Sequence, residues 1–304
     1  MGRVVISLDA ELAWGFHDLD DVPGQRIQNA RSGWRAALSL FDRYEIPATW
    51  AVVGHLCLGS CDGTHADHPA PADWFDRDPG GSAADADRWF APDLVEAIRR
   101  AAVDHEIGCH SFSHVLFDAE TTDEALADAE LDAALDAAAR LPDSPKSFVF
   151  PRNRVAHRDR LAEHGFTSYR GRKPREAGED SVLRAPRKAV RSVRGRAPPV
   201  VDPAVDEWGL VNVPASLYLF EFETRLGGLL PEHPTVRRAR AGVDAAAESS
   251  GVFHLWLHPN NLIGDPQRER LRAVLQYIDS RRREGAVSVE TMQSIAETET
   301  EGVQ

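Results

Sequence analysis

Residues 4–11 read Val-Val-Ile-Ser-Leu-Asp-Ala-Glu, and this stretch decides the fold. The apolar run over residues 4–8 predicts a buried strand. Side chains alternate between the two faces of a strand, so Asp9 and Glu11 should point to one side while Ala10 points to the other. The sequence therefore predicts two carboxylates side by side at the end of a strand.

A second polar motif follows about a hundred residues later, where residues 106–114 read Glu-Ile-Gly-Cys-His-Ser-Phe-Ser-His. Residues 106–109 predict another short strand. If His110 opens a helical turn, His114 lies four residues on and on the same face. Two imidazoles and a carboxylate suit a divalent metal with an open position for water. Both motifs end strands, which is where active sites of parallel α/β folds collect.

The remaining elements follow an alternating pattern. Amphipathic stretches predict helices, and short apolar runs predict strands. The expected helices cover residues 31–44, 125–141 and 267–284, and the expected strands cover residues 48–53, 147–150, 210–214, 252–257 and 286–289.

The ordered motifs resemble those of the polysaccharide deacetylases of the NodB-homology type. Besides the two motifs above, the resemblance rests on Ser-Phe-Val-Phe-Pro-Arg-Asn at residues 147–153 and on Phe-His-Leu-Trp-Leu-His-Pro at residues 253–259. It implies an α/β fold, a distorted (β/α)7-type barrel, with residues 1–304 as a single catalytic domain. It also implies a metal-dependent hydrolase that removes an N-acetyl group from an amino sugar of a glycan or glycan precursor.

The resemblance also implies roles for individual residues. The strictest members carry two adjacent Asp residues in the first motif. Here Ala10 stands at the second position and Glu11 takes the ligand role, which places the chain in a divergent Asp-x-Glu branch. The metal, most simply zinc with cobalt or manganese as alternatives, would be held by Glu11, His110 and His114. The expected catalytic residues are Asp9 as base, His258 as acid and Arg152 as the partner of Asp9, and the expected substrate contacts are Trp14, Trp89, Asn153 and Trp256.

Two segments depart from the regular pattern. Residues 57–92 are rich in Gly, Pro, Asp and Ala and predict a long insertion, whose aromatic residues either stack on a sugar or anchor the loop. The insertion holds Cys57, Cys61, His65 and His68, but it lacks the usual Cys-x-x-Cys pair of a zinc site, so packing is the default interpretation. Residues 184–196 are basic and either bind an anionic part of the substrate or a membrane surface, or form a solvated loop.

Composition and net charge indicate the environment in which the protein works. The formal charge is −13, and only three of the 35 basic residues are Lys. An acidic, Lys-poor chain is typical of a halophilic organism, because at molar salt the Debye length falls to about 3 Å and self-repulsion costs little. An ordinary acidic cytosolic protein is the alternative. The same charge disfavours nucleic-acid binding.

The apolar runs and cysteines point to the cytoplasm. No run approaches the 18 or so apolar residues of a transmembrane segment, and no signal peptide precedes the first strand. Three cysteines give no disulfide framework. The substrate would then be an N-acylated sugar or oligosaccharide inside the cell, lipid- or nucleotide-linked before export.

Two other functions remain open. One keeps the fold and removes formyl or another acyl group from a different nitrogen, as a deformylase or other amide hydrolase. The other is a non-catalytic carbohydrate-binding relative, which Ala10 favours because a lost ligand is how such a site decays.

Overall fold

The computed structural model describes residues 1–81, 84–174, 197–221 and 232–302. The basic segment at residues 184–196 lies outside the described residues. The three cysteines of the chain are unpaired. None of the helices in the described ranges has the length and apolar character that a membrane span needs.

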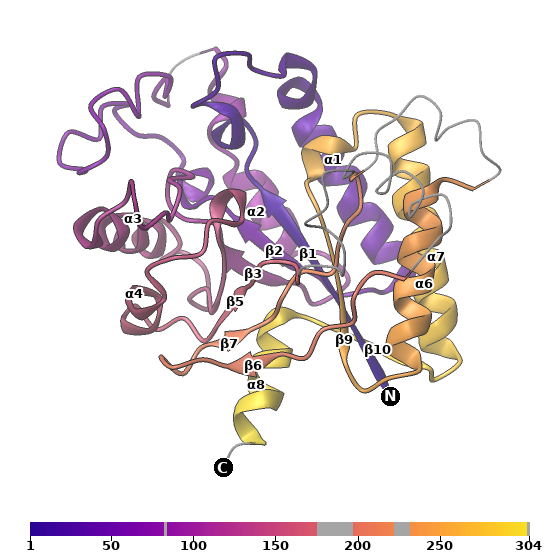
Figure 1. Cartoon of the computed structure of the whole chain (residues 1–304). Coiled ribbons are helices and arrows are strands. Elements are labelled where there is room, and N and C mark those ends of the chain that lie inside the picture. Colours follow the sequence, from indigo (N-terminus) through magenta and orange to yellow (C-terminus); the bar gives the residue numbers. More distant parts are fainter. Residues whose placement is uncertain (82–83, 175–196, 222–231, 303–304) are drawn as a thin grey trace, which may run out of the picture.

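A parallel sheet runs outward from β1, the strand that the first motif predicted (Figure 1). Each strand of the N-terminal half pairs with the one before it. These strands are β1 (Gly2–Ala10), β2 (Thr49–Val52), β3 (Glu106–Cys109), β4 (Ser147–Val149) and β5 (Ser168–Arg170). Short strands suffice because nearly all of their side chains are buried on both faces.

The C-terminal half returns to β1. Strand β9 (Val252–Leu257) pairs with β1 along residues 3–8, on the side opposite β2. Strand β10 (Val287–Glu290) pairs with residues 2–5 of β1 below β2. Strand β1 is therefore the central strand, and its carboxyl end lies among the ends of β2 and β9.

The segment from β7 (Val211–Asn212) to β8 (Leu217–Tyr218) closes the sheet into a distorted barrel. It first runs parallel to β5 and then crosses to run parallel to β9. Two backbone hydrogen bonds continue these pairings: the Val213 N–H donates to the Tyr169 carbonyl, and the Ser216 N–H donates to the His254 carbonyl. Counting this segment as one strand, the ring has seven positions within the described ranges, and the predicted distorted (β/α)7-type barrel is confirmed. Outside the ring, β6 (Ala204–Val205) pairs antiparallel with β7.

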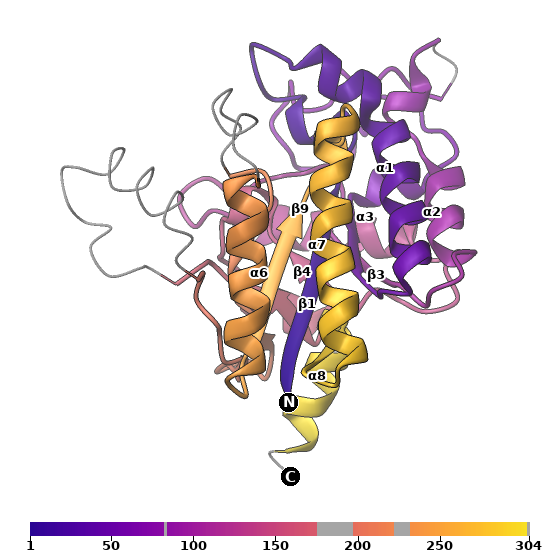
Figure 2. The same cartoon turned by 90° about the vertical axis from the view of Figure 1, so that its right-hand side faces the viewer.

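Helices cover the barrel. In Figure 2, α7 (Asp265–Arg283) and α6 (Pro234–Ala247) stand side by side in front of β1 and β9, and α1 (Gly24–Tyr44) packs on the other flank of α7. The far side carries α2 (Pro92–Arg99), α3 (Glu124–Ala137) and α4 (Arg158–Glu163). The expected strand at residues 286–289 corresponds to β10, and α8 (Met292–Glu301) follows it. The single-turn helices are η1 (Trp14–Phe16), η2 (Gly54–Cys57), η3 (Ala86–Arg88), η4 (Pro151–Asn153) and η6 (Pro259–Asn261).

The two termini lie at one end of the barrel (Figure 1), where β1 begins. All of the ring strands are parallel, so their carboxyl ends meet at the opposite end. The polar residues that end β1, β3, β5 and β9 therefore gather there.

Candidate active site

The two carboxylates of the first motif lie together, as predicted. Asp9 is the penultimate residue of β1 and Glu11 directly follows the strand, and they are 3% and 5% exposed. Both face the imidazole of His258, whose Nε2 lies 3.7 Å from Asp9 Oδ2 and 3.7 Å from Glu11 Oε1. Ala10 is fully buried in the apolar core cluster. The residue that departs from the family pattern is therefore a packing residue here.

The two histidines of the second motif meet through a loop, and the expected helical turn is wrong. Ser111 and His114 both adopt left-handed backbone angles, with φ of 59° and 66°, which a right-handed helical turn does not contain. The chain folds back, and the ring centroids of His110 and His114 lie 5.1 Å apart. Their Nε2 atoms lie 3.6 and 3.3 Å from Glu11 Oε2.

Glu130 of α3 holds this loop from behind, and sequence reasoning missed it. Its side chain is fully buried. One carboxylate oxygen accepts the backbone N–H groups of Phe112 and Ser113, both at 2.9 Å, and the other accepts the Ser113 hydroxyl at 2.5 Å. Burial raises the pKa of Glu130. In the sequence Glu130 stands within an Ala-rich helix, and its position on the buried face was the only available signal.

Glu11, His110 and His114 have a donor set that fits a divalent metal. Their three ligand atoms lie within 4.8 Å of one another. His110 Nδ1 donates to the Val149 carbonyl at 2.6 Å, which leaves the lone pair on Nε2. That buried Nε2 has no hydrogen-bond partner among the described residues and faces Glu11. Asn260 holds the carboxylate from outside by donating to Glu11 Oε1 at 3.1 Å. Three protein ligands leave a coordination position open, as in catalytic metal sites.

Arg170, and not Arg152, is the partner of Asp9. Arg170 ends β5 and is fully buried, and its guanidinium donates to both oxygens of Asp9 at 2.5 and 2.7 Å. Arg152 lies on η4 at the surface and pairs with Asp18 at 2.5 Å. The expected Arg152–Asp9 pair was wrong because the backbone of η4 turns left-handed at Arg152, with φ of 49°. The signal that could have found Arg170 is an arginine directly after the short run at residues 166–169.

Charges around the site keep both carboxylates ionised. Burial raises the pKa of Asp9, but Arg170 more than offsets it and holds the pKa below its usual range. Burial also raises the pKa of Glu11, while His258, His110 and His114 bring it well below the usual range. Burial lowers the pKa of His114, which favours the neutral imidazole that a metal needs.

A buried hydrogen-bond chain supports the Arg170–Asp9 pair. Arg170 donates to the Ser7 hydroxyl at 3.1 Å, and Ser7 shares a 2.9 Å bond with His254 Nε2. His254 donates from Nδ1 to the Val213 carbonyl at 3.1 Å. Burial lowers the pKa of His254 to about 3. His254 is thus a neutral core histidine, and it orients the arginine through Ser7.

His258 and Trp256 line the exposed side of the site. The side chain of His258 is 21% exposed, and its Nδ1 contacts the hydroxyl of Tyr218 at 3.2 Å. Tyr218 in turn donates to Asn261 Oδ1 at 2.6 Å. The partly buried ring of Trp256 packs against that of Tyr218, with ring centroids 4.4 Å apart, and lies under the Arg170 guanidinium at 4.4 Å. These contacts fix His258 Nε2 between the two carboxylates.

The other expected substrate contacts divide into two groups. Asn153 lies at the site, where its side-chain oxygen accepts from Arg170 at 3.2 Å. Trp14 and Trp89 are 0% and 8% exposed and belong to the main core cluster. Trp14 donates to the Trp89 carbonyl at 3.2 Å. In this structure both tryptophans anchor the insertion to the barrel, and neither offers a ring face to a sugar.

An α/β barrel with two carboxylates and three histidines at the mouth defines the class of the protein. The sequence model of the polysaccharide deacetylase family matches residues 18–168, a stretch that includes the two histidines of the second motif. The model covers just under half of the chain, and the resemblance to this family that the motifs predicted is confirmed. A search of curated proteins found no match.

Solved structures share the whole fold at low identity. One is described as a polysaccharide deacetylase from Mycobacterium smegmatis, with a TM-score of 0.65 and 18% identity over 99% of this chain and 90% of that one. Puue allantoinase has a TM-score of 0.60 and 16% identity, covering 97% and 89% of the two chains. A third, described as a polysaccharide deacetylase from Pseudomonas aeruginosa PAO1, has a TM-score of 0.59 and 16% identity over the same shares. These similarities establish the fold.

Proposed function

We propose that the protein is a metal-dependent hydrolase that removes the N-acetyl group from an amino sugar. The observation that carries this proposal is the triad Glu11, His110 and His114, which has a vacant Nε2 on His110 and lies beside Asp9 and His258. The match to the polysaccharide deacetylase family supports the same reaction class. Zinc suits two imidazoles and one carboxylate, and cobalt or manganese can replace it.

Each residue of the site has a distinct role in this proposal. A bound divalent ion supplies Lewis acidity, which polarises the acyl oxygen and lowers the pKa of water. Asp9, kept ionised by Arg170, accepts the proton of the attacking water. His258 carries a proton on Nε2 to the departing nitrogen, because it is the histidine on the exposed side of the site. Arg170 and Asn153 hold Asp9 in place, so the base is oriented before substrate arrives.

The substrate is an N-acylated sugar or oligosaccharide, with a lipid or nucleotide carrier as one form. Trp256 and Tyr218 are the partly exposed rings beside His258, and a tryptophan face suits the apolar face of a sugar ring. Trp256 therefore stays a candidate for sugar contact, and Tyr218 takes the place of Trp14 and Trp89.

Metal content and acetate release test this proposal together. We expect about one divalent ion per chain at this site in the wild type, lost in Glu11→Ala and in His110→Ala, with acetate release from N-acetylated amino sugars lost in parallel. Asp132→Ala is the matched control, because this carboxylate is 72% exposed on α3. Full activity in His110→Ala without metal at this site would contradict the proposal.

A second candidate keeps the same machinery and hydrolyses a different amide, such as a formyl group or a ureide. The likeness to Puue allantoinase shows that this fold is also found in a protein named for another reaction. A panel of acetylated sugars, formylated sugars and ureides separates the two candidates. The binding-protein alternative is weakened, because Ala10 lies in the apolar core. Ala10 is thus a packing residue and does not mark a lost metal ligand.

A further inference from the structure

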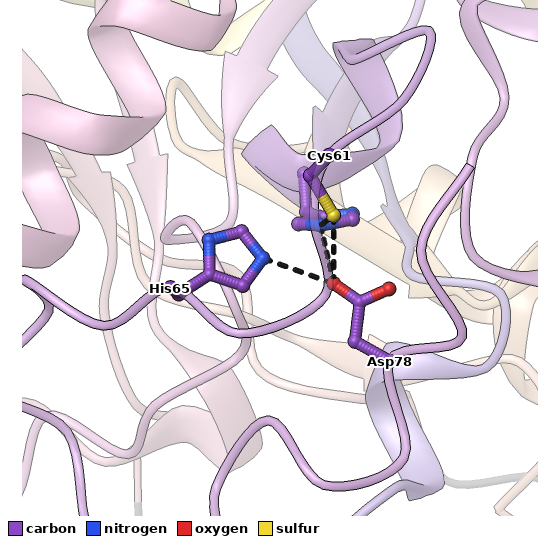
Figure 3. Close-up of side chains that lie close together, drawn as sticks. Cys61, His65 and Asp78 are labelled. Carbon is purple, nitrogen blue, oxygen red and sulfur yellow. Dashed lines mark hydrogen bonds and ion pairs between the residues drawn. The ribbon is translucent and has the colours of Figure 1, made fainter.

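A second group of side chains with metal-binding atoms lies apart from the active site, with one member on η2 and three in the insertion that follows. Nε2 of His55 and His65, Sγ of Cys61 and a carboxylate oxygen of Asp78 lie within 4.8 Å of one another. Figure 3 shows the labelled Cys61, His65 and Asp78 pointing toward one another. Asp78 Oδ2 lies 2.9 Å from each histidine and 3.1 Å from the sulfur.

Each of three inner atoms is oriented by a contact on its outer side. His55 donates from Nδ1 to the Trp89 carbonyl at 3.2 Å, which leaves its Nε2 lone pair toward the group. The Gly63 N–H donates to Cys61 Sγ at 3.3 Å. The Gly80 N–H donates to the outer oxygen of Asp78 at 3.0 Å. Outer contacts of this kind hold the ligands of metal sites in place.

The arrangement of donors and charges inside the group suits a bound cation. The side chains of His55 and Asp78 are both 0% exposed. With its proton on Nδ1, His55 presents a lone pair to a carboxylate oxygen 2.9 Å away, and two facing lone pairs repel. A buried carboxylate also requires a partner of opposite charge. A divalent ion among the four atoms satisfies both requirements at once.

We propose that His55, Cys61, His65 and Asp78 bind a structural Zn²⁺. One thiolate, two imidazoles and one carboxylate form a four-coordinate set that leaves no position for water, which distinguishes a structural zinc from a catalytic one. The set differs from the cysteines and histidines that the sequence brought to notice. Cys57 is outside it, and His68 lies instead 3.4 Å from Glu130.

The proposed zinc would brace the active-site loop. His55 lies on η2, and its backbone N–H donates to the Phe112 carbonyl at 2.9 Å, while the Gly54 N–H donates to the Ser111 carbonyl at 2.8 Å. Phe112 and Ser111 lie between the two histidines of the second motif. The ion would therefore tie the insertion and η2 to the loop that positions His110 and His114.

Cobalt spectroscopy tests the proposal without relying on activity. A thiolate bound to Co²⁺ gives a charge-transfer band in the near ultraviolet, and the Glu11 site contains no sulfur. The full-length chain with His110→Ala and His114→Ala, stripped with a chelator and titrated with Co²⁺, isolates the insertion site. We expect this band to saturate at one Co²⁺ per chain, and Zn²⁺ to abolish it by competition. Because these variants lack the Glu11 site, the result does not depend on the proposed function.

Variants then identify the ligands. Cys61→Ser should remove the band, whereas Cys57→Ser, the matched control on η2, should keep it. His65→Gln is a second variant at a more exposed ligand and should weaken Co²⁺ binding roughly 10- to 100-fold. No band at saturating Co²⁺ in the protein with Cys61 intact would overturn the proposal. A band that persists in Cys61→Ser, or that disappears in Cys57→Ser, would overturn the ligand set.

Discussion

Arg170 and Arg152 are the same residue type but differ in how deeply they are buried. Arg170 is fully buried and donates to Asp9 with both terminal nitrogens, whereas Arg152 is partly exposed and pairs with Asp18. A buried carboxylate that loses its hydrogen-bonded arginine is left charged and desolvated, while a surface pair contributes little. The two residues should therefore respond very differently to the same substitution.

We predict that Arg170→Met lowers kcat/KM by roughly 100-fold or more and destabilises the fold by about 3–5 kcal/mol, because Asp9 loses its orientation and its counter-charge. Steady-state kinetics and urea unfolding measure the two effects. Arg152→Met is the control and should change kcat/KM no more than a few-fold. Equal losses in both variants would return the orienting role to Arg152.

At the scale of elements, the loop after β3 depends on α3. The loop has left-handed residues at Ser111 and His114, a conformation that costs free energy for residues other than glycine. Glu130 of α3 compensates by accepting two backbone N–H groups of the loop. The helix thus determines the distance between two histidines that it does not contain.

We predict that Glu130→Ala weakens metal binding at the Glu11 site roughly 10- to 100-fold, because the unsupported loop no longer holds both histidines. Glu130→Gln should restore most of the affinity, since one side-chain oxygen can still accept both backbone N–H groups. Metal affinity by competition with a chelating dye measures this for the three proteins. If Glu130→Ala bound metal as tightly as wild type, the loop would be rigid without the helix.

For the whole molecule, burial keeps several histidines neutral. Burial lowers the pKa of His105 to about 4 and that of His254 to about 3. In the unfolded chain both titrate near 6.5. Below that pH the unfolded state binds protons that the folded state does not, so the free energy of unfolding falls as the pH falls. The stability linked to these groups is fully present above pH 6.5 and is lost progressively down to pH 4 and below.

We predict that the free energy of unfolding declines as the pH falls from 6.5 to 4. In His105→Asn the slope of this decline should be smaller by about 1.4 kcal/mol per pH unit, which corresponds to one proton. His105 is suited to this test because it lies away from the active site. Its Nδ1 accepts the Ala48 N–H at 3.2 Å. Asn keeps an acceptor near that position. Urea unfolding at a series of pH values measures both slopes. Identical slopes would show that His105 takes up its proton in the folded state as well.

Local patterns predicted most of the barrel. The run before Asp9 specified β1, residues 106–109 and 252–257 matched β3 and β9, and the order of the motifs led to the family. These signals are readable because periodicity and strand ends depend only on neighbours in the chain. The salt adaptation and the cytoplasmic location stay predictions, since they concern the setting and not the fold.

The sequence by itself predicted β1, β3 and β9 and the polar residues at their carboxyl ends. It did not predict β5, the strand that ends in Arg170. Only the tertiary structure decided that Arg170 reaches Asp9, that Glu130 supports the histidine loop, and that Asp78 joins His55. The physical reason is the distance along the chain: Arg170 and Asp9 are 161 residues apart and meet only because β5 and β1 face each other across a closed barrel. A polar side chain can be buried when a partner satisfies it, and the identity of that partner follows from the closure of the sheet.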